Sequence, residues 1–141
     1  MLGIYVHIPF CKSKCKYCDF ASYPNLIEKQ DEYINKIISD LKLLKGRKAD
    51  TVYIGGGTPS VLSEDNIKRL LFEINNTVEL CRDTEFTVEV NPATVSVSKA
   101  RALKSGGVNR ISMGAQSFLD SELKRIGRIH TAEDTKHTFK I

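Results

Sequence analysis

The sequence contains no tryptophan and only four prolines, and it lacks any apolar run near the roughly 18 residues that a membrane span requires. Its first residues carry neither a charged region nor a small-residue cleavage site, so they do not resemble a secretory signal. We therefore expect a cytoplasmic protein without a membrane span. In such a protein, closely spaced cysteines indicate metal or redox chemistry rather than a disulfide framework.

Charge of one sign is not concentrated in any part of the chain. The net charge is +4 over 141 residues, and lysine and arginine are spread along the sequence. This distribution argues against a nucleic-acid partner. Lys12, Lys14 and Lys16 lie among the cysteines, either as a solvated loop face or as cations that balance clustered thiolates.

The most distinctive segment covers residues 5–20 and reads YVHIPFCKSKCKYCDF. It holds Cys11, Cys15 and Cys18 directly after an apolar stretch. A structural zinc site normally uses four protein ligands, so three thiols leave one metal position open. Thiolates suit zinc or an iron–sulfur cluster. A redox pair of Cys15 and Cys18, or simply buried thiols, are the alternatives, and Cys81 is either an ordinary thiol or a fourth metal ligand.

Hydrophobic periodicity predicts strands that alternate with helices. The strands are expected at residues 2–8, 51–54, 86–90 and 108–115, and the helices at 26–45, 64–74, 98–104, 120–126 and from 131 onward. The predicted helix caps are Gly46, Ser63, Asp120 and Thr131. This alternation favours an α/β fold with a parallel sheet, since parallel strands need helical crossovers. Four βα units make either a small open sheet or the first part of a longer barrel, and we expect the latter.

Unusual residues come directly after these strands, where parallel βα proteins place their sites. The cysteines follow the first strand, and the glycines at 55–57 follow the second as a tight turn or as a backbone cradle for a polar ligand. Glu89 alternates with apolar neighbours near the end of the third strand, so it faces solvent or a ligand. Gln116 ends the fourth strand. It, Arg110 and Arg128 are candidate carboxylate anchors, and surface salt bridges are the alternative for the two arginines.

The spacing Cys11-x3-Cys15-x2-Cys18, with an aromatic residue before the last cysteine, resembles the motif of the radical S-adenosylmethionine (SAM) superfamily. GGGTP at 55–59, a strand glutamate before Asn-Pro and GVNRISMGAQSF at 107–118 resemble one branch of that superfamily. The branch contains the oxygen-independent coproporphyrinogen III oxidases (HemN) and the HemW haem chaperones. The matching motifs span residues 5 to about 131, nearly the whole sequence.

The resemblance implies a [4Fe–4S] cluster on Cys11, Cys15 and Cys18, with SAM chelating the fourth iron. The positions that match SAM contacts of the oxidase branch are Tyr5, Tyr17, Gly56, Gly57, Thr58, Glu89, Gln116 and Arg128. The resemblance also implies three kinds of partner. These are SAM, a porphyrin or haem, and an electron donor such as flavodoxin or ferredoxin. The implied fold is the first four units of a partial (βα)6 TIM-like barrel.

Two departures from the branch refine these expectations. The oxidases carry a further cysteine two residues after the third ligand, where this sequence has Phe20, so the local pattern resembles HemW and implies haem delivery. True oxidase chemistry remains the alternative, and a non-catalytic zinc module is the alternative of another class. Members of the branch are more than twice as long, so residues 1–141 are expected to be the N-terminal part of a radical SAM core domain, with no second domain.

Overall fold

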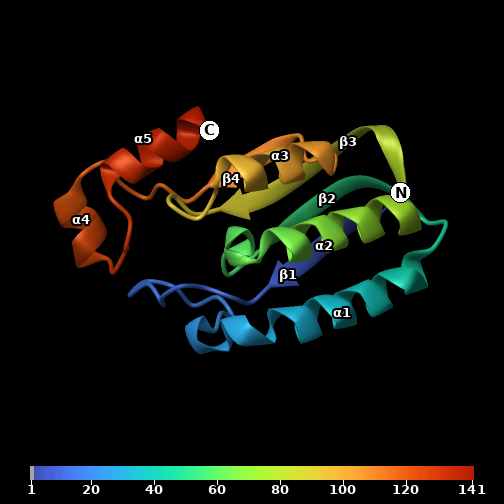
Figure 1. The fold of residues 1–141 in the computed structure, drawn as a ribbon, viewed down its shortest axis with the longest axis horizontal. Coiled ribbons are helices and arrows are strands. Elements are labelled where there is room, and N and C mark those ends of the chain that lie inside the picture. Colours follow the sequence, from blue (N-terminus) through green and yellow to red (C-terminus); the bar gives the residue numbers. More distant parts are fainter. Residues whose placement is uncertain (1) are drawn as a thin grey trace.

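The computed structural model describes residues 2–141 and contains a four-stranded, fully parallel sheet in the order β1-β2-β3-β4 (Figure 1). The strands are β1 (Leu2–Ile8), β2 (Lys48–Gly56), β3 (Glu79–Val90) and β4 (Arg110–Met113). The α-helices are α1 (Gln30–Leu41), α2 (Glu64–Thr77), α3 (Val97–Ser105), α4 (Asp120–Arg125) and α5 (Ala132–Lys140). The α/β fold with parallel βα repeats is therefore confirmed, and the sheet is open, with β1 and β4 at its edges.

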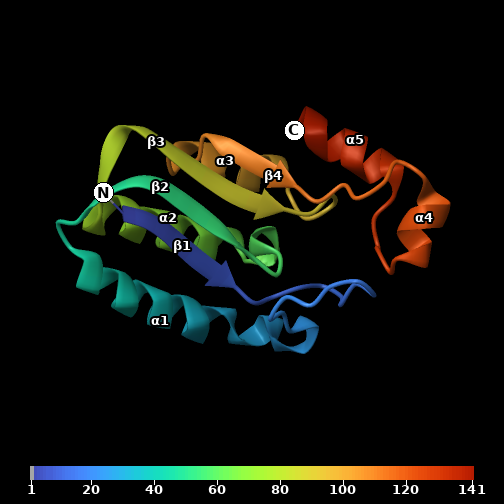
Figure 2. The same cartoon turned by 180° about the vertical axis from the view of Figure 1, so that it is seen from behind.

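Helices α1, α2 and α3 cover one face of the sheet, and the strands lie in front of them when the molecule is turned over (Figures 1 and 2). The covered face follows the period-2 alternation of each strand. Its buried side chains include Ile4, Val6, Ile8, Val52, Ile54, Phe86, Val88 and Val90, packed against Ile34, Leu70, Leu71 and Ile74 of the helices. Burial of this apolar set is the main stabilising contribution to the fold.

The helix expected at 26–45 is shorter than its apolar periodicity predicted. It consists of a 3-10 turn at Pro24–Lys29, the α-helix α1 and a second 3-10 turn at Lys42–Leu44. Leu26 has non-helical angles of φ −118° and ψ 17°, so the first turn is kinked. Periodicity records which face is apolar but not whether the hydrogen bonds are i+3 or i+4, which explains the difference.

The predicted caps at Ser63 and Thr131 are confirmed. The Ser63 hydroxyl accepts from Asn66 N–H, and Thr131 forms a capping box with Asp134. Gly46 has the expected left-handed φ of 73°, but its N–H donates to the Thr77 carbonyl at 3.1 Å rather than to a carbonyl of the helix that precedes it. The Asp120 cap is wrong, because α4 begins at that residue and Leu119 is the cap, without a side-chain hydrogen bond. Asp120 Oδ1 instead accepts from Ala132 N–H at 2.8 Å, at the start of α5.

Strand lengths also differ from the prediction. β2 and β3 begin earlier than expected. Their polar first residues, Lys48 and Glu79, pair with each other, and the apolar alternation used for the prediction does not detect such residues. β4 is shorter, at Arg110–Met113. No helix within residues 2–141 is long and apolar enough to cross a membrane.

Register brings the carboxyl ends of all four strands to one edge of the sheet. Ile8 pairs with Gly56 and Val90 with Met113. The segments that follow the strands therefore meet there, and the α4–α5 segment lies beyond the same edge (Figure 1).

Candidate cofactor site

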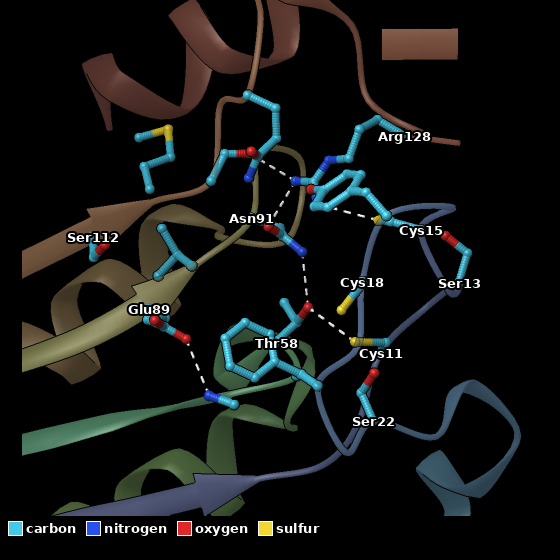
Figure 3. A pocket seen from close by; sticks show the side chains of 18 residues that line it. Cys11, Ser13, Cys15, Cys18, Ser22, Thr58, Glu89, Asn91, Ser112 and Arg128 are labelled. Carbon is cyan, nitrogen blue, oxygen red and sulfur yellow. Dashed lines mark hydrogen bonds between the residues drawn. The ribbon is translucent and has the colours of Figure 1, made fainter. Parts of the chain in front are cut away.

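A cavity of about 320 Å³ lies at the carboxyl ends of the strands. This volume is within the range of small-molecule pockets. The sequence-predicted residues among its lining are Cys11, Cys15, Tyr17, Cys18, Gly56, Gly57, Thr58, Glu89, Gln116 and Arg128 (Figure 3). Residues from 11 to 128 thus converge on one cavity, although their cofactor contacts stay predictions.

Tyr5 is the predicted site residue that does not line this cavity. Its side chain lies on the uncovered face of the sheet, where the residue is 58% exposed. The ring stacks on Tyr53 with centroids 6.0 Å apart, and its hydroxyl lies 3.2 Å from His7 Nδ1. Burial and the nearby charge of Glu89 raise the pKa of Tyr5.

The cysteine loop is closed by contacts within the chain. Tyr23 N–H donates to the Pro9 carbonyl at 2.7 Å, and Cys18 N–H donates to the Cys15 carbonyl at 3.2 Å. Lys14 Nζ donates to the Phe20 carbonyl at 2.6 Å and to Ser22 Oγ at 3.0 Å. Lys14 therefore ties the middle of the loop to its C-terminal part, a role that neither prediction for the lysines included.

Two of the three sulfurs contact polar side chains. Cys11 Sγ lies 3.5 Å from Thr58 Oγ1, and Arg128 Nη1 donates to Cys15 Sγ at 3.6 Å. Within residues 2–141, no three His, Cys, Asp or Glu side chains form a group that could hold a metal ion as they stand.

Cys81 does not belong to this site. It lies near the amino-terminal end of β3, whereas Val90 at the other end of that strand lines the cavity. Even with the register shift in β3, which shortens the path, the two positions lie about 20 Å apart along the sheet. The alternative of a zinc site with Cys81 as fourth ligand is therefore wrong.

The glycines after β2 allow two chain segments to approach closely. A Cβ on Gly57 would lie 2.6 Å from the Phe10 carbonyl oxygen and 3.1 Å from Cys11 Sγ. Gly57 N–H donates to the Ile8 carbonyl at 2.8 Å, and Thr58 N–H donates to the Phe10 carbonyl at 2.8 Å. The glycine run thus packs directly against the cysteine loop. A side chain at Gly57 would push that loop away, so glycine is needed at this position.

Glu89 lies on the uncovered face at the rim of the cavity. Tyr53 Oη donates to its Oε1 at 2.6 Å. Gly56 N–H donates to its Oε2 at 3.0 Å (Figure 3). The hydrogen bond to this carboxylate raises the pKa of Tyr53. Two donors therefore fix the carboxylate at a place where it can accept from a bound hydroxyl or ammonium group.

Sequence reasoning assigned no site role to several residues in or beside the cavity, among them Asn91 and His130. Asn91 was predicted only to end the third strand, but its amide bonds to both Thr58 and Arg128. His130, which received no role, is buried beside Arg128, and this burial lowers the pKa of its imidazole. The Asn-Pro pair was the available signal for Asn91, and the sequence contains none for His130. Gln116 has a φ of 63°, a backbone strain that often accompanies functional sites.

Comparison with known proteins identifies the family. The sequence profile of the radical SAM superfamily matches residues 5–141. The chain belongs to the radical SAM superfamily. This result confirms the resemblance drawn from the cysteine motif, and the superfamily implies SAM and a [4Fe–4S] cluster.

Within the radical SAM superfamily, the chain is similar to haem chaperones. It is 41% identical to the haem chaperone HemW of Escherichia coli over an alignment of 145 positions, which covers 99% of this chain and 38% of that protein. The HemW of Bacillus subtilis is also 41% identical, over 99% of this chain and 38% of that protein. Bovine mitochondrial radical S-adenosyl methionine domain-containing protein 1 is 37% identical over 97% of this chain and 32% of its own length.

The fold resembles that of the coproporphyrinogen III oxidase HemN from Escherichia coli, a radical SAM enzyme. The TM-score is 0.86 at 29% identity, over 98% of this chain and 33% of that one. The chain spans about two fifths of the length of the HemW proteins it matches.

The residues present fit the cofactors of this superfamily. Thiolates are the usual ligands of iron–sulfur clusters, and three thiols line one cavity together with a glycine cradle and a fixed carboxylate.

Proposed function

We propose that this chain binds a [4Fe–4S] cluster through Cys11, Cys15 and Cys18 and binds SAM at the iron that lacks a protein ligand. The observation that carries the proposal is the gathering of ten predicted residues around one cavity, nine from the ends of the four strands and Arg128 from the segment between α4 and α5. Three thiols leave one iron of a four-iron cluster open, which is what a chelating ligand needs. When bound, the cluster and SAM supply the one-electron cleavage of SAM that starts radical chemistry.

The surrounding side chains would bind and orient SAM. The carboxylate of Glu89 is an acceptor for its hydroxyl or ammonium groups, and Gln116 and Arg128 supply donors for its carboxylate. Backbone groups at Gly56 and Gly57, the Thr58 hydroxyl and the Tyr17 ring complete the cradle. Tyr5 would join the site from the uncovered face, next to Glu89.

We further propose a role in haem or porphyrin metabolism, as a haem chaperone of the HemW type. Identity of 41% to two HemW proteins supports this choice over the oxidase, whose structure matches at 29%. Phe20, 66% exposed and lining the cavity, stands where the oxidases carry their extra cysteine. Haem as ligand, a flavodoxin or ferredoxin as electron donor and a cytoplasmic location belong to this proposal. Oxidative decarboxylation of coproporphyrinogen is the second candidate.

Anaerobic reconstitution with iron and sulfide tests the cluster. We expect a brown protein with about four irons per chain, and a colourless protein when all three motif cysteines are replaced by alanine. A wild-type protein that holds one zinc and no iron would contradict the proposal. If the cluster forms, SAM should change the EPR spectrum of its reduced state, because SAM binds directly to iron.

The choice between chaperone and oxidase needs a separate experiment on the full-length protein. Titration with haem, followed by absorbance, should give stoichiometric binding, and incubation with coproporphyrinogen III, SAM and reductant should give no decarboxylated product. Product formation without haem binding would favour the oxidase.

A further inference from the structure

A chain of hydrogen bonds connects the sulfurs of Cys11 and Cys15 around the wall of the cavity (Figure 3). Cys11 Sγ lies 3.5 Å from Thr58 Oγ1, and Asn91 Nδ2 donates to that same oxygen at 2.8 Å. Asn91 Oδ1 accepts from Arg128 Nη2 at 2.7 Å, and Arg128 Nη1 donates to Cys15 Sγ at 3.6 Å. Asn91 is the midpoint of this chain, from which one branch leads to each cysteine.

The chemistry of the groups fixes the direction of every bond once Cys11 is a thiolate, the form in which cysteine binds a metal. An arginine side chain only donates, so the atom of Asn91 that faces Arg128 must be the amide oxygen. The amide nitrogen then faces Thr58 and donates to its oxygen. A thiolate at Cys11 can only accept, so the Thr58 hydroxyl donates to Cys11 Sγ. Thr58 is 2% exposed, so little water competes for that hydrogen. Both sulfurs therefore accept a hydrogen bond. The amide of Asn91 orients both donors, through its nitrogen at Thr58 and its oxygen at Arg128.

The Arg128 branch is held in place by further contacts. Arg128 Nη2 also donates to the Gly114 carbonyl at 2.7 Å, and its Nε donates to His130 Nδ1 at 3.3 Å. A Cβ on Gly114 would lie 2.7 Å from Asn91 Oδ1 and 3.5 Å from Arg128 Nη2. The bare backbone at Gly114 thus lets the guanidinium lie against Asn91 while it reaches Cys15.

We propose that Asn91 is a positioning residue that directs one hydrogen-bond donor to each of two cluster ligands, Thr58 Oγ1 to Cys11 and Arg128 Nη1 to Cys15. This inference rests on the proposed cluster. Hydrogen bonds to ligand sulfurs make iron–sulfur clusters easier to reduce, and partners that orient ligands help to retain the metal. Thr58 and Arg128 thereby act on the cysteines, in addition to the SAM contacts proposed for them.

Replacement of Asn91 in the full-length protein tests the whole chain of bonds. Asn91→Leu keeps the approximate volume but removes both polar ends. We expect the reconstituted cluster to have a more negative midpoint potential and to lose iron to a chelator about tenfold faster than wild type. The midpoint potential is the decisive measurement, because a purely structural defect would lower thermal stability without shifting it.

Asn91→Asp separates the two branches. A carboxylate only accepts, so it keeps Arg128 but turns the Thr58 hydroxyl hydrogen away from Cys11. We expect it to shift the potential in the same direction as Thr58→Val, and we expect Thr58→Ser to retain the wild-type potential. Adding Thr58→Val to Asn91→Asp should then cause no further shift, since both changes remove the same donor.

The outcomes distinguish this inference from the function on which it rests. A wild-type protein that takes up no cluster would overturn both. A wild-type cluster with four irons, together with an unchanged potential and iron retention in Asn91→Leu and Thr58→Val, would overturn the role of Asn91 alone. If Asn91→Leu does not fold, Asn91→Asp and Thr58→Val decide the question, because a wild-type potential in both would equally overturn it.

Discussion

The two faces of the sheet are built by the same strands and differ in almost every property. On the face beneath α1–α3, Ile8 is 0% exposed and Phe86 is 1% exposed. On the opposite face, Tyr5 is 58% exposed, and Glu89 and Tyr53 hydrogen-bond to each other. Alternation with period 2 separates the two sets residue by residue. The covered face supplies stability, so the uncovered face and the rim beyond it can carry polar groups without weakening the core.

The largest effect should come from a single thiol at the rim. Cys18→Ser should reduce the iron content after reconstitution from about four per chain to near zero, because an alcohol is a poor cluster ligand. Cys81→Ser is the matched control, since Cys81 lies at the other end of the sheet and should leave the iron content unchanged. Iron loss in Cys81→Ser would contradict the conclusion that Cys81 lies outside the cluster site.

A core substitution should show the opposite pattern. Phe86→Ala removes a fully buried ring from the covered face and should lower the free energy of unfolding by about 3–5 kcal/mol, measured by urea denaturation. Tyr5→Ala removes a ring of similar size from the uncovered face and should cost less than about 1 kcal/mol. An equal loss for Tyr5→Ala would mean that this face is packed against something in solution.

Glu89 should affect ligand binding more than stability. Glu89→Gln removes the charge but keeps an acceptor, and we expect SAM to bind the reconstituted protein about tenfold more weakly, as measured by the EPR change at increasing SAM concentration. Glu89→Ala should weaken binding further. Tyr53→Phe, which removes one donor to the carboxylate, should have a smaller effect than either. Unchanged SAM affinity in Glu89→Ala would contradict the proposal that Glu89 contacts SAM.

The smallest effect should be a pH dependence at His130. Burial lowers the pKa of this imidazole, so the folded protein favours the neutral form. The resulting stability is fully present above the unfolded-state pKa of about 6.5 and is lost as the pH falls below it, because the unfolded chain then binds more protons. Thermal unfolding at pH 7.5 and 5.5 should show this loss, and His130→Gln should reduce it. An equal loss of thermal stability between pH 7.5 and 5.5 in the wild type and His130→Gln would contradict this role of His130.

The sequence predicted the parts of the molecule that depend on local patterns. Alternation located the strands, and short-range capping located the ends of α2 and α5. The spacing of Cys11, Cys15 and Cys18 was sufficient to indicate the radical SAM superfamily. These features need only neighbouring residues, because period, capping and ligand spacing act over a few positions.

The tertiary structure alone decided how distant segments meet. Strand register placed Asn91 between Thr58 and Arg128, which are separated by 33 and 37 residues from it in sequence. The same register excluded Cys81 from the cavity and set Gly57 beneath the cysteine loop. A shift of one residue in register would displace these segments relative to one another and turn Glu89 to the covered face of the sheet. The sequence by itself therefore determined which groups the protein possesses, and the packing of parallel strands determined which of them act together.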